Sequence, residues 1–114
     1  MSVWPDFEAP PQYADAAAGW EDPALPDFRL IWAVARKLGY SIGLHGSMRR
    51  DCDLIAAPWT IAAGSDEYLV EALCTCLNAR IIGEPEEKPH GRRAWSLQVD
   101  GYVKTIDLSV MPRV

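Results

Sequence analysis

Apolar and polar residues alternate with two different periods along the chain, and the first of these is helical. From Phe28 to Leu38, apolar positions recur every three or four residues, which predicts a helix over residues 28–38 with Asp27 as its N-cap and Gly39 at its end. The predicted inward-facing stripe consists of Phe28, Ile31, Trp32, Ala35 and Leu38. The basic residues between these positions are expected to face solvent.

The period then changes to two, which is typical of strands. It predicts one strand that starts at Tyr40 and ends at Gly46, and a second strand from Asp51 to Ala57. Successive side chains of a strand point to opposite faces of a sheet. Asp51 and Asp53 are therefore expected to project from the same face.

A second helix is predicted to follow Ser65, because two acidic residues come next and suit the first turn of a helix. We expect this helix to close at Gly83 and Pro85, and residues 84–91 to form a charged loop. Its predicted inward stripe is Leu69, Leu73, Cys76 and Leu77.

The strongest hairpin signal in the chain is the dipeptide Asp100-Gly101. A two-residue turn at this point predicts the cross-strand pairs Val99 with Tyr102, Leu97 with Lys104, and Trp95 with Ile106. The alternation then places Asp107 in mid-strand on the more polar face. Arg92 and Arg93 are expected near Asp107, in a surface ion pair worth less than about 1 kcal/mol.

This order of elements predicts an α+β fold over residues 27–114, namely a small mixed sheet with two helices packed on one face. A chain of 114 residues is long enough for one core. Trp59 and Trp95 are expected to pack in that core. The other face of the sheet is expected to be open, and the acidic residues predicted to gather there are Asp51, Asp53 and Asp107.

Residues 1–26 are predicted to form a separate acidic, proline-rich arm. The first 27 residues contain six acidic residues and no Lys or Arg, whereas the remainder holds 11 basic and 10 acidic residues. This balance argues against non-specific nucleic-acid binding, which needs a basic surface. Four aromatic residues in the arm predict that it packs either on its own domain or on a partner with a basic surface. The candidate partner-binding residues are Asp6, Glu8, Asp15, Glu21 and Asp22.

The cysteines Cys52, Cys74 and Cys76 are odd in number and lack the spacing of a disulfide framework. We expect reduced thiols packed in the core of a cytoplasmic protein. No apolar run approaches the roughly 18 residues that a membrane-spanning helix needs, and no signal segment opens the sequence. No membrane association is therefore predicted.

Three carboxylates beside a glycine turn are the arrangement that metal-dependent phosphoryl transfer requires. Carboxylates hold Mg²⁺ or Mn²⁺, which neutralise the attacking and leaving oxygens, and a glycine lets backbone N–H groups approach phosphate. His45 precedes the glycine and is a possible base or metal ligand. A single histidine at the end of a strand is more often a structural, hydrogen-bonded residue, which is the favoured interpretation.

These residues resemble the minimal nucleotidyltransferase domain of the polymerase-beta superfamily. Its pattern is a Gly-Ser pair after one strand, an acid-x-acid pair on the next strand, and a third acid on a later strand. The matching residues are Gly46 and Ser47, then Asp51 and Asp53, and finally Asp107. The resemblance implies that the three acids bind metal and are catalytic, and that nucleotide is bound by Gly46, Ser47, Arg49 and Arg50.

The chain departs from the family pattern between these two motifs. Only Met48, Arg49 and Arg50 separate the Gly-Ser pair from the acids, where the family has a helical turn of several residues. The two arginines could bind a triphosphate or could neutralise the acids instead. The same stretch is similar to small uncharacterised proteins of bacteriophages and prophages, which implies an origin in a mobile element.

Two functions follow as hypotheses, of which the sequence favours the first and leaves the second as the alternative. In the first, a degenerate nucleotidyltransferase-like domain from a phage binds the basic surface of a host protein complex through its acidic residues, as an inhibitor of the anti-CRISPR type would. In the second, the domain is an active nucleotidyltransferase that uses Mg²⁺ or Mn²⁺ and transfers a nucleotide to a hydroxyl group of a protein or nucleic acid.

Overall fold

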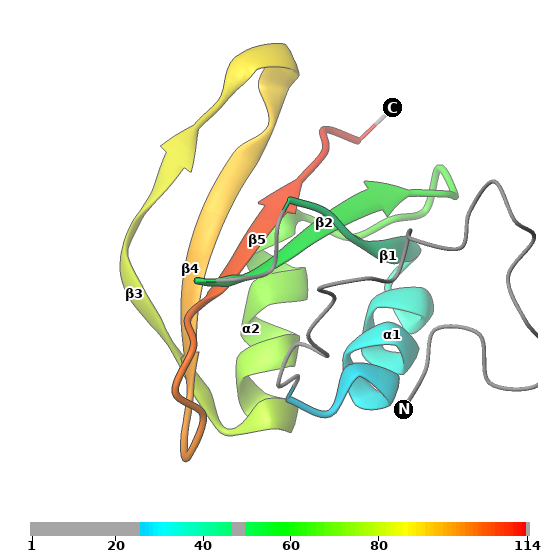
Figure 1. Ribbon diagram of the computed structural model, residues 1–114. Coiled ribbons are helices and arrows are strands. Elements are labelled where there is room, and N and C mark those ends of the chain that lie inside the picture. The colour runs from blue at the N-terminus through cyan, green and yellow to red at the C-terminus, as the bar shows by residue number, and fades with distance from the viewer. Residues whose placement is uncertain (1–25, 47–49, 114) are drawn as a thin grey trace, which may run out of the picture.

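The computed structural model describes residues 26–46 and 50–113 (Figure 1). In chain order the elements are α1 (Phe28–Lys37), β1 (Tyr40–Leu44), β2 (Cys52–Pro58), α2 (Asp66–Leu77), β3 (Ala79–Glu87), the short 3-10 helix η2 (Pro89–Gly91), β4 (Arg93–Val99) and β5 (Ile106–Val110). No helix in the described ranges is long and apolar enough to span a membrane.

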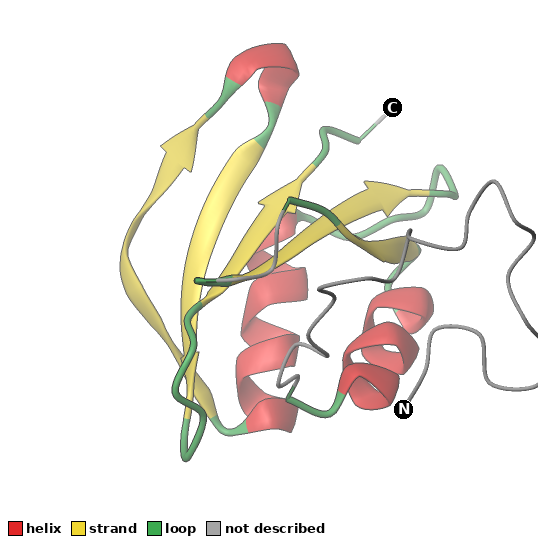
Figure 2. Cartoon of the chain, viewed as in Figure 1, coloured by secondary structure: helices red, strands yellow, loops and turns green. Residues whose placement is uncertain are grey.

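The strands form one mixed sheet in the order β1-β2-β5-β4-β3. β2 and β5 run parallel in the centre, and the other neighbouring pairs are antiparallel. Both helices lie on the same side of the sheet, where α1 packs on β1 and α2 packs on β3 and β4 (Figure 2). The predicted α+β class, with two helices on one face of a small mixed sheet, is confirmed.

Helix α1 starts where the sequence predicts, because the Asp27 side chain accepts a hydrogen bond from the Leu30 backbone N–H at 3.1 Å. Ile31 and Ala35 are buried against the sheet. Trp32 does not belong to this stripe, since 45% of its surface is exposed. The physical reason is the helical step of about 100° per residue, which turns position 32 away from the core when Ile31 faces it.

Helix α2 also begins as predicted, with Ser65 as its N-cap, but it ends earlier than expected. Asn78 adopts the left-handed conformation with φ 54°, which stops the helix five residues before Gly83. The segment that was predicted to be helix and charged loop is therefore mostly the edge strand β3, in which charged side chains can face solvent. Cys76 is exposed, and the buried residues of α2 are Leu69, Val70 and Leu73.

The hairpin of β4 and β5 has a longer loop and a different register from the prediction. Leu97 pairs with Ile106 and Trp95 with Leu108, so the predicted register is wrong by two residues. The Gln98 side chain donates a hydrogen bond to the Tyr102 carbonyl oxygen. In a two-residue turn, this oxygen would instead be left to accept a backbone hydrogen bond of the sheet. Because the slip is an even number, every side chain stays on its predicted face.

The core lies between the helices and the sheet, and it contains Trp95 as predicted. Trp59 was expected there too, but 56% of its surface is exposed, because it follows the end of β2. Cys52 is the buried thiol, whereas Cys74 is only partly buried, so the prediction of core thiols holds for one cysteine.

Candidate carboxylate site on the open face of the sheet

Asp53 and Asp107 lie directly beside each other on the face of the sheet opposite the helices. They are register partners in the parallel pair of β2 and β5, where neighbouring strands are about 4.8 Å apart. The residues that flank them along the strands, including Leu54 and Leu108, are buried on the helix side. Alternation therefore turns both carboxylates to the open face.

Gly46 approaches the Asp53 carboxylate from the end of β1. The backbone N–H of His45 donates a hydrogen bond to the Asp53 carbonyl oxygen at 3.0 Å, which keeps the chain alongside β2 past the end of the strand. Gly46 has φ +72°, and a Cβ atom at this position would lie only 2.7 Å from Oδ2 of Asp53. The absence of a side chain is therefore what allows the turn to lie against the carboxylate.

The electrostatic environment of Asp107 reflects a concentration of negative charge. Partial burial raises the pKa of Asp107, and the negative charges of Asp53 and Asp51 raise it further, whereas His45 and Lys88 act in the opposite direction. All three predicted acids thus contribute to the negative charge around Asp107. The open face brings Asp53 and Asp107 together, and the charge of Asp51, the residue before β2, also acts on Asp107.

The donor set fits a hard divalent cation in part. Mg²⁺ is commonly held by one or two carboxylates, while water and substrate phosphates complete its coordination. Asp53 and Asp107 are two such carboxylates on adjacent strands. Within residues 26–46 and 50–113, no group of three His, Cys, Asp or Glu side chains is arranged to hold a metal ion, and the metal-binding role of Asp51 stays a prediction.

Arg92 and Arg93 do not pair with Asp107, contrary to the prediction. Nη1 of Arg92 donates to Oγ of Ser109 at 3.3 Å, and its Nε donates to the Pro89 carbonyl oxygen at 3.2 Å. Arg93 lies on the helix side, where it pairs with acids of the α2 N-terminus. Alternation along β4 turns Arg93 away from Asp107, whereas the guanidinium of Arg92 is held by its bonds to Ser109 and Pro89.

Two polar residues near the acids were not identified from the sequence as site residues. Ser109 lies two positions after Asp107 on the same strand face, and it is buried and hydrogen-bonded to Arg92. Lys88 precedes η2, and its positive charge acts on Asp107. The spacing of two between Asp107 and Ser109 was visible in the sequence, but the position of Lys88 depends on the missed strand β3.

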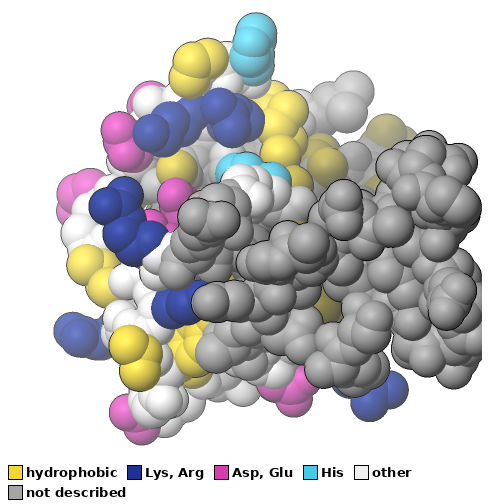
Figure 3. Space-filling view, viewed as in Figure 1, with side chains coloured by type: hydrophobic (Ala, Val, Ile, Leu, Met, Phe, Trp, Pro, Cys, Tyr) yellow, Lys and Arg dark blue, Asp and Glu magenta, His cyan; other side chains and the backbone are white. Residues whose placement is uncertain are grey.

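Several predicted site residues lie outside the described part of the chain. These are Ser47 and Arg49 at the turn, and the arm residues Asp6, Glu8, Asp15, Glu21 and Asp22. Arg50 is described and is exposed at the start of the segment that leads into β2. Figure 3 shows acidic and basic side chains interspersed over the described part of the surface that it presents.

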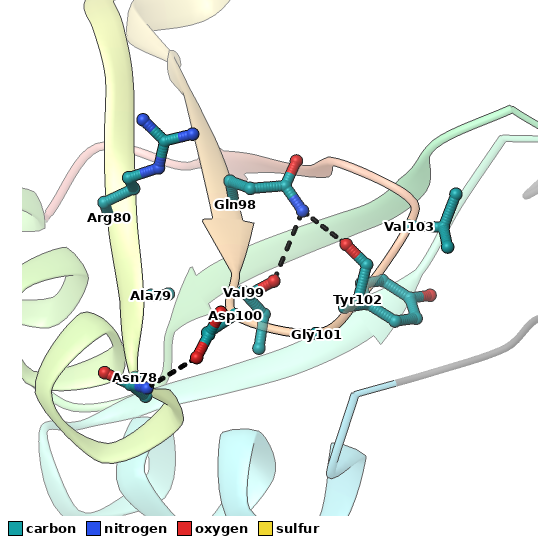
Figure 4. A pocket seen from close by; sticks show the side chains of 9 residues that line it. All are labelled: Asn78, Ala79, Arg80, Gln98, Val99, Asp100, Gly101, Tyr102 and Val103. Atoms are coloured by element: carbon teal, nitrogen blue, oxygen red, sulfur yellow. Dashed lines mark hydrogen bonds between the residues drawn. The ribbon is translucent and has the colours of Figure 1, made fainter.

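A separate groove of about 630 Å³ lies where β3 begins and β4 ends (Figure 4). Arg80 and Gln98, which are register partners, lie along it, and Nδ2 of Asn78 donates to Oδ2 of Asp100 at its lower end at 3.3 Å. None of the three acids lines this groove. The groove is therefore distinct from the carboxylate site.

Comparisons of the chain with models of protein families, with curated proteins and with solved structures gave no match. The resemblance to the minimal nucleotidyltransferase domain therefore stays a prediction from the residues themselves.

Proposed function

We propose that this protein is a metal-dependent nucleotidyltransferase-like domain that binds a nucleoside triphosphate at the open face of its sheet. The observation that carries the proposal is the register of Asp53 with Asp107, which sets two carboxylates side by side next to a glycine turn. The proposed reaction is the transfer of a nucleotide from the triphosphate to a hydroxyl group of a protein or nucleic acid: the hydroxyl oxygen forms a bond to the α-phosphorus, the bond from that phosphorus to the β-phosphate side breaks, and pyrophosphate leaves.

In this proposal both carboxylates bind the metal ion, and one of them also accepts a proton. Asp53 and Asp107 would hold Mg²⁺ or Mn²⁺, which would neutralise the charge that develops on the phosphate oxygens. Asp107 is also the candidate to accept the proton of the acceptor hydroxyl group, because it is partly buried and adjoins Asp53. Gly46 keeps the space next to Asp53 open for a phosphate oxygen.

Basic residues on the β4 side of the acids suit the phosphates. Arg92 is held in place by two hydrogen bonds, to Ser109 and to the Pro89 carbonyl oxygen. Lys88 contributes a positive charge near Asp107, although it also contacts Glu86 at 3.3 Å. An arginine that is already oriented loses less freedom when it binds a phosphate than an unrestrained one does.

The test is calorimetric titration of the full-length protein with Mn²⁺ and each nucleoside triphosphate. We expect saturable binding by the unchanged protein, and loss of that binding in Asp53→Asn. Asp100→Asn is the matched control, because it removes an exposed carboxylate in the turn after β4, where its Oδ2 accepts from Asn78 and not from a residue of the carboxylate site. Circular dichroism confirms that each variant is folded.

Two results would contradict the proposal. One is the absence of binding by the unchanged, folded protein across the whole panel of nucleotides. The other is binding that survives in Asp53→Asn with the same affinity as in Asp100→Asn.

A second candidate function rests on the uneven charge of the chain. Residues 1–25 contain five acidic residues and no Lys or Arg, which suits a basic surface on a host protein complex, as in a phage-encoded inhibitor of the anti-CRISPR type. The test is affinity capture from host lysate by the full-length protein and by a variant with all five acids changed to amides. A captured protein that the variant no longer retains supports this function, and equal capture by both contradicts it.

A further inference from the structure

Two exposed tryptophans and an arginine form a cluster on the outer surface of α1. Trp32 and Trp59 are 45% and 56% exposed. The guanidinium carbon of Arg36 lies 5.3 Å from the Trp32 ring centroid and 5.5 Å from that of Trp59. We call these three residues the indole–arginine cluster. Its two indole rings come from different parts of the chain, so the fold assembles it.

The surroundings of the indole–arginine cluster are apolar and basic. Ile61, two residues after Trp59, is 93% exposed. Helix α1 itself carries Arg29, Arg36 and Lys37, and it has no acidic residue between Phe28 and Lys37. A cation over an indole ring contributes about 0.5–1 kcal/mol when exposed and about 2 kcal/mol or more when desolvated. A ligand that covers the cluster would therefore strengthen contacts that already exist.

The N-terminal segment has the complementary chemistry. Residues 1–25 contain five acidic residues and no Lys or Arg. They also contain four aromatic residues, Trp4, Phe7, Tyr13 and Trp20. Acids suit the arginines and the lysine of α1, and aromatic rings suit the exposed indoles.

The connection of this segment to α1 favours the same pairing. The segment joins the described chain at Pro26, which is buried and directly precedes the N-cap of α1. Trp32 is six residues further on, roughly 9 Å along the helix axis. A chain of this length reaches several times that distance, and a short tether gives its ligand an effective concentration of about a millimolar.

We propose that residues 1–25 bind the indole–arginine cluster of the same molecule, with their acids on the basic residues of α1 and their aromatic rings on Trp32 and Trp59. The nucleotide site lies on the other side of the sheet, so this contact does not depend on it. The acids engaged on α1 are not available to an external basic partner at the same time, so such a partner would have to displace the segment.

The test uses isotope-labelled full-length protein and nuclear magnetic resonance. We expect nuclear Overhauser cross-peaks between aromatic protons of residues 1–25 and the indole protons of Trp32 and Trp59. In a variant with all five acids replaced by amides, the Trp32 and Trp59 indole N–H signals should shift. The Trp95 indole N–H signal should stay in place, because this group is buried and donates to Asp66. The replacements are Asp6→Asn, Glu8→Gln, Asp15→Asn, Glu21→Gln and Asp22→Asn.

Three outcomes overturn the proposal. The first is the absence of cross-peaks from the segment to either indole. The second is a set of Trp32 and Trp59 signals that does not change when the five acids are neutralised, since the contact is assigned to charge. The third is that the cross-peaks join a labelled copy to an unlabelled copy in a mixed sample, which would make a second molecule the ligand.

Discussion

Two pairs of neighbouring acidic residues lie on opposite sides of the sheet, and the two pairs differ in the groups that surround their carboxylates. On the helix side, Arg93 Nη1 lies 3.0 Å from Oδ2 of Asp66 and 2.6 Å from Oε1 of Glu67. Trp95 Nε1 also donates to Asp66, at 3.0 Å. On the open side, Asp107 adjoins Asp53, and within the described residues no ion pair is formed with Asp107.

The two environments move pKa values in opposite directions. Hydrogen bonds with the Asp66 carboxyl group and with Arg93 lower the pKa of Glu67 to about 2, while burial raises that of Asp66. Burial and the charges of Asp53 and Asp51 raise the pKa of Asp107. On the helix side, Arg93 of β4 pairs with both acids of α2 and so joins the helix to the strand. On the open side, the negative charges of Asp53 and Asp51 act on Asp107, and negative charge of this kind favours binding of a cation.

The largest effect on stability is expected from Asp66→Ala. The change removes the acceptor of the buried Trp95 indole N–H and one carboxylate of Arg93. Leaving a buried donor without a partner costs about 1–3 kcal/mol in the free energy of unfolding. Urea denaturation measures this, with Glu71→Ala as the control from an exposed position of the same helix. Equal losses in the two variants would show that the helix-side pair does not hold α2 to the sheet.

Gly46→Ala tests the open-side pair by adding a methyl group beside it without changing any charge. The new Cβ atom would displace the Asp53 carboxylate, and the left-handed backbone would cost about 1 kcal/mol. Gly101→Ala is the matched control, because Gly101 has φ +78° and nothing within 4 Å of an added Cβ atom. Calorimetry should show Mn²⁺ affinity reduced about 10-fold or more in Gly46→Ala alone. A similar affinity in both variants would remove Asp53 from the proposed cation site.

Asp107→Asn is expected to stabilise the protein at neutral pH in the absence of divalent cations. A carboxyl group whose pKa is raised on folding contributes stability that is present below its unfolded value and is lost as the pH rises through the folded value. The amide removes this loss, so the melting temperature should rise at neutral pH and hardly change in acid. Thermal denaturation at both pH values checks the prediction against Asp100→Asn. A gain of the same size in acid would mean that charge at Asp107 is not the cause.

Local signals in the sequence predicted most of the elements, and tertiary effects account for the errors. Asp27 and Ser65 act as caps through contacts within four residues, and the alternation along β2 and β5 placed the acids on the correct face. The early stop at Asn78 was not recognised, because a left-handed residue other than glycine leaves a weak sequence signal. That error concealed β3, and with it the position of Lys88. The pairing itself joins two residues, Asp53 and Asp107, that lie more than fifty positions apart in the chain.

The smallest effect on stability is expected from Glu67→Gln. Its sign tests whether the helix-side pair differs from the open-side pair. Hydrogen bonds with Asp66 and with Arg93 lower the pKa of Glu67 from 4.5 to about 2. These contacts therefore contribute stability that is present above the ordinary pKa and is lost as the pH falls toward about 2. Because Glu67 is exposed, the amide should destabilise the protein only slightly at neutral pH. The difference should disappear in strong acid. Urea denaturation across this range should therefore show a change in the free energy of unfolding opposite in sign to that of Asp107→Asn. Changes of the same sign in the two variants would show that the two acidic pairs do not differ as their surroundings indicate.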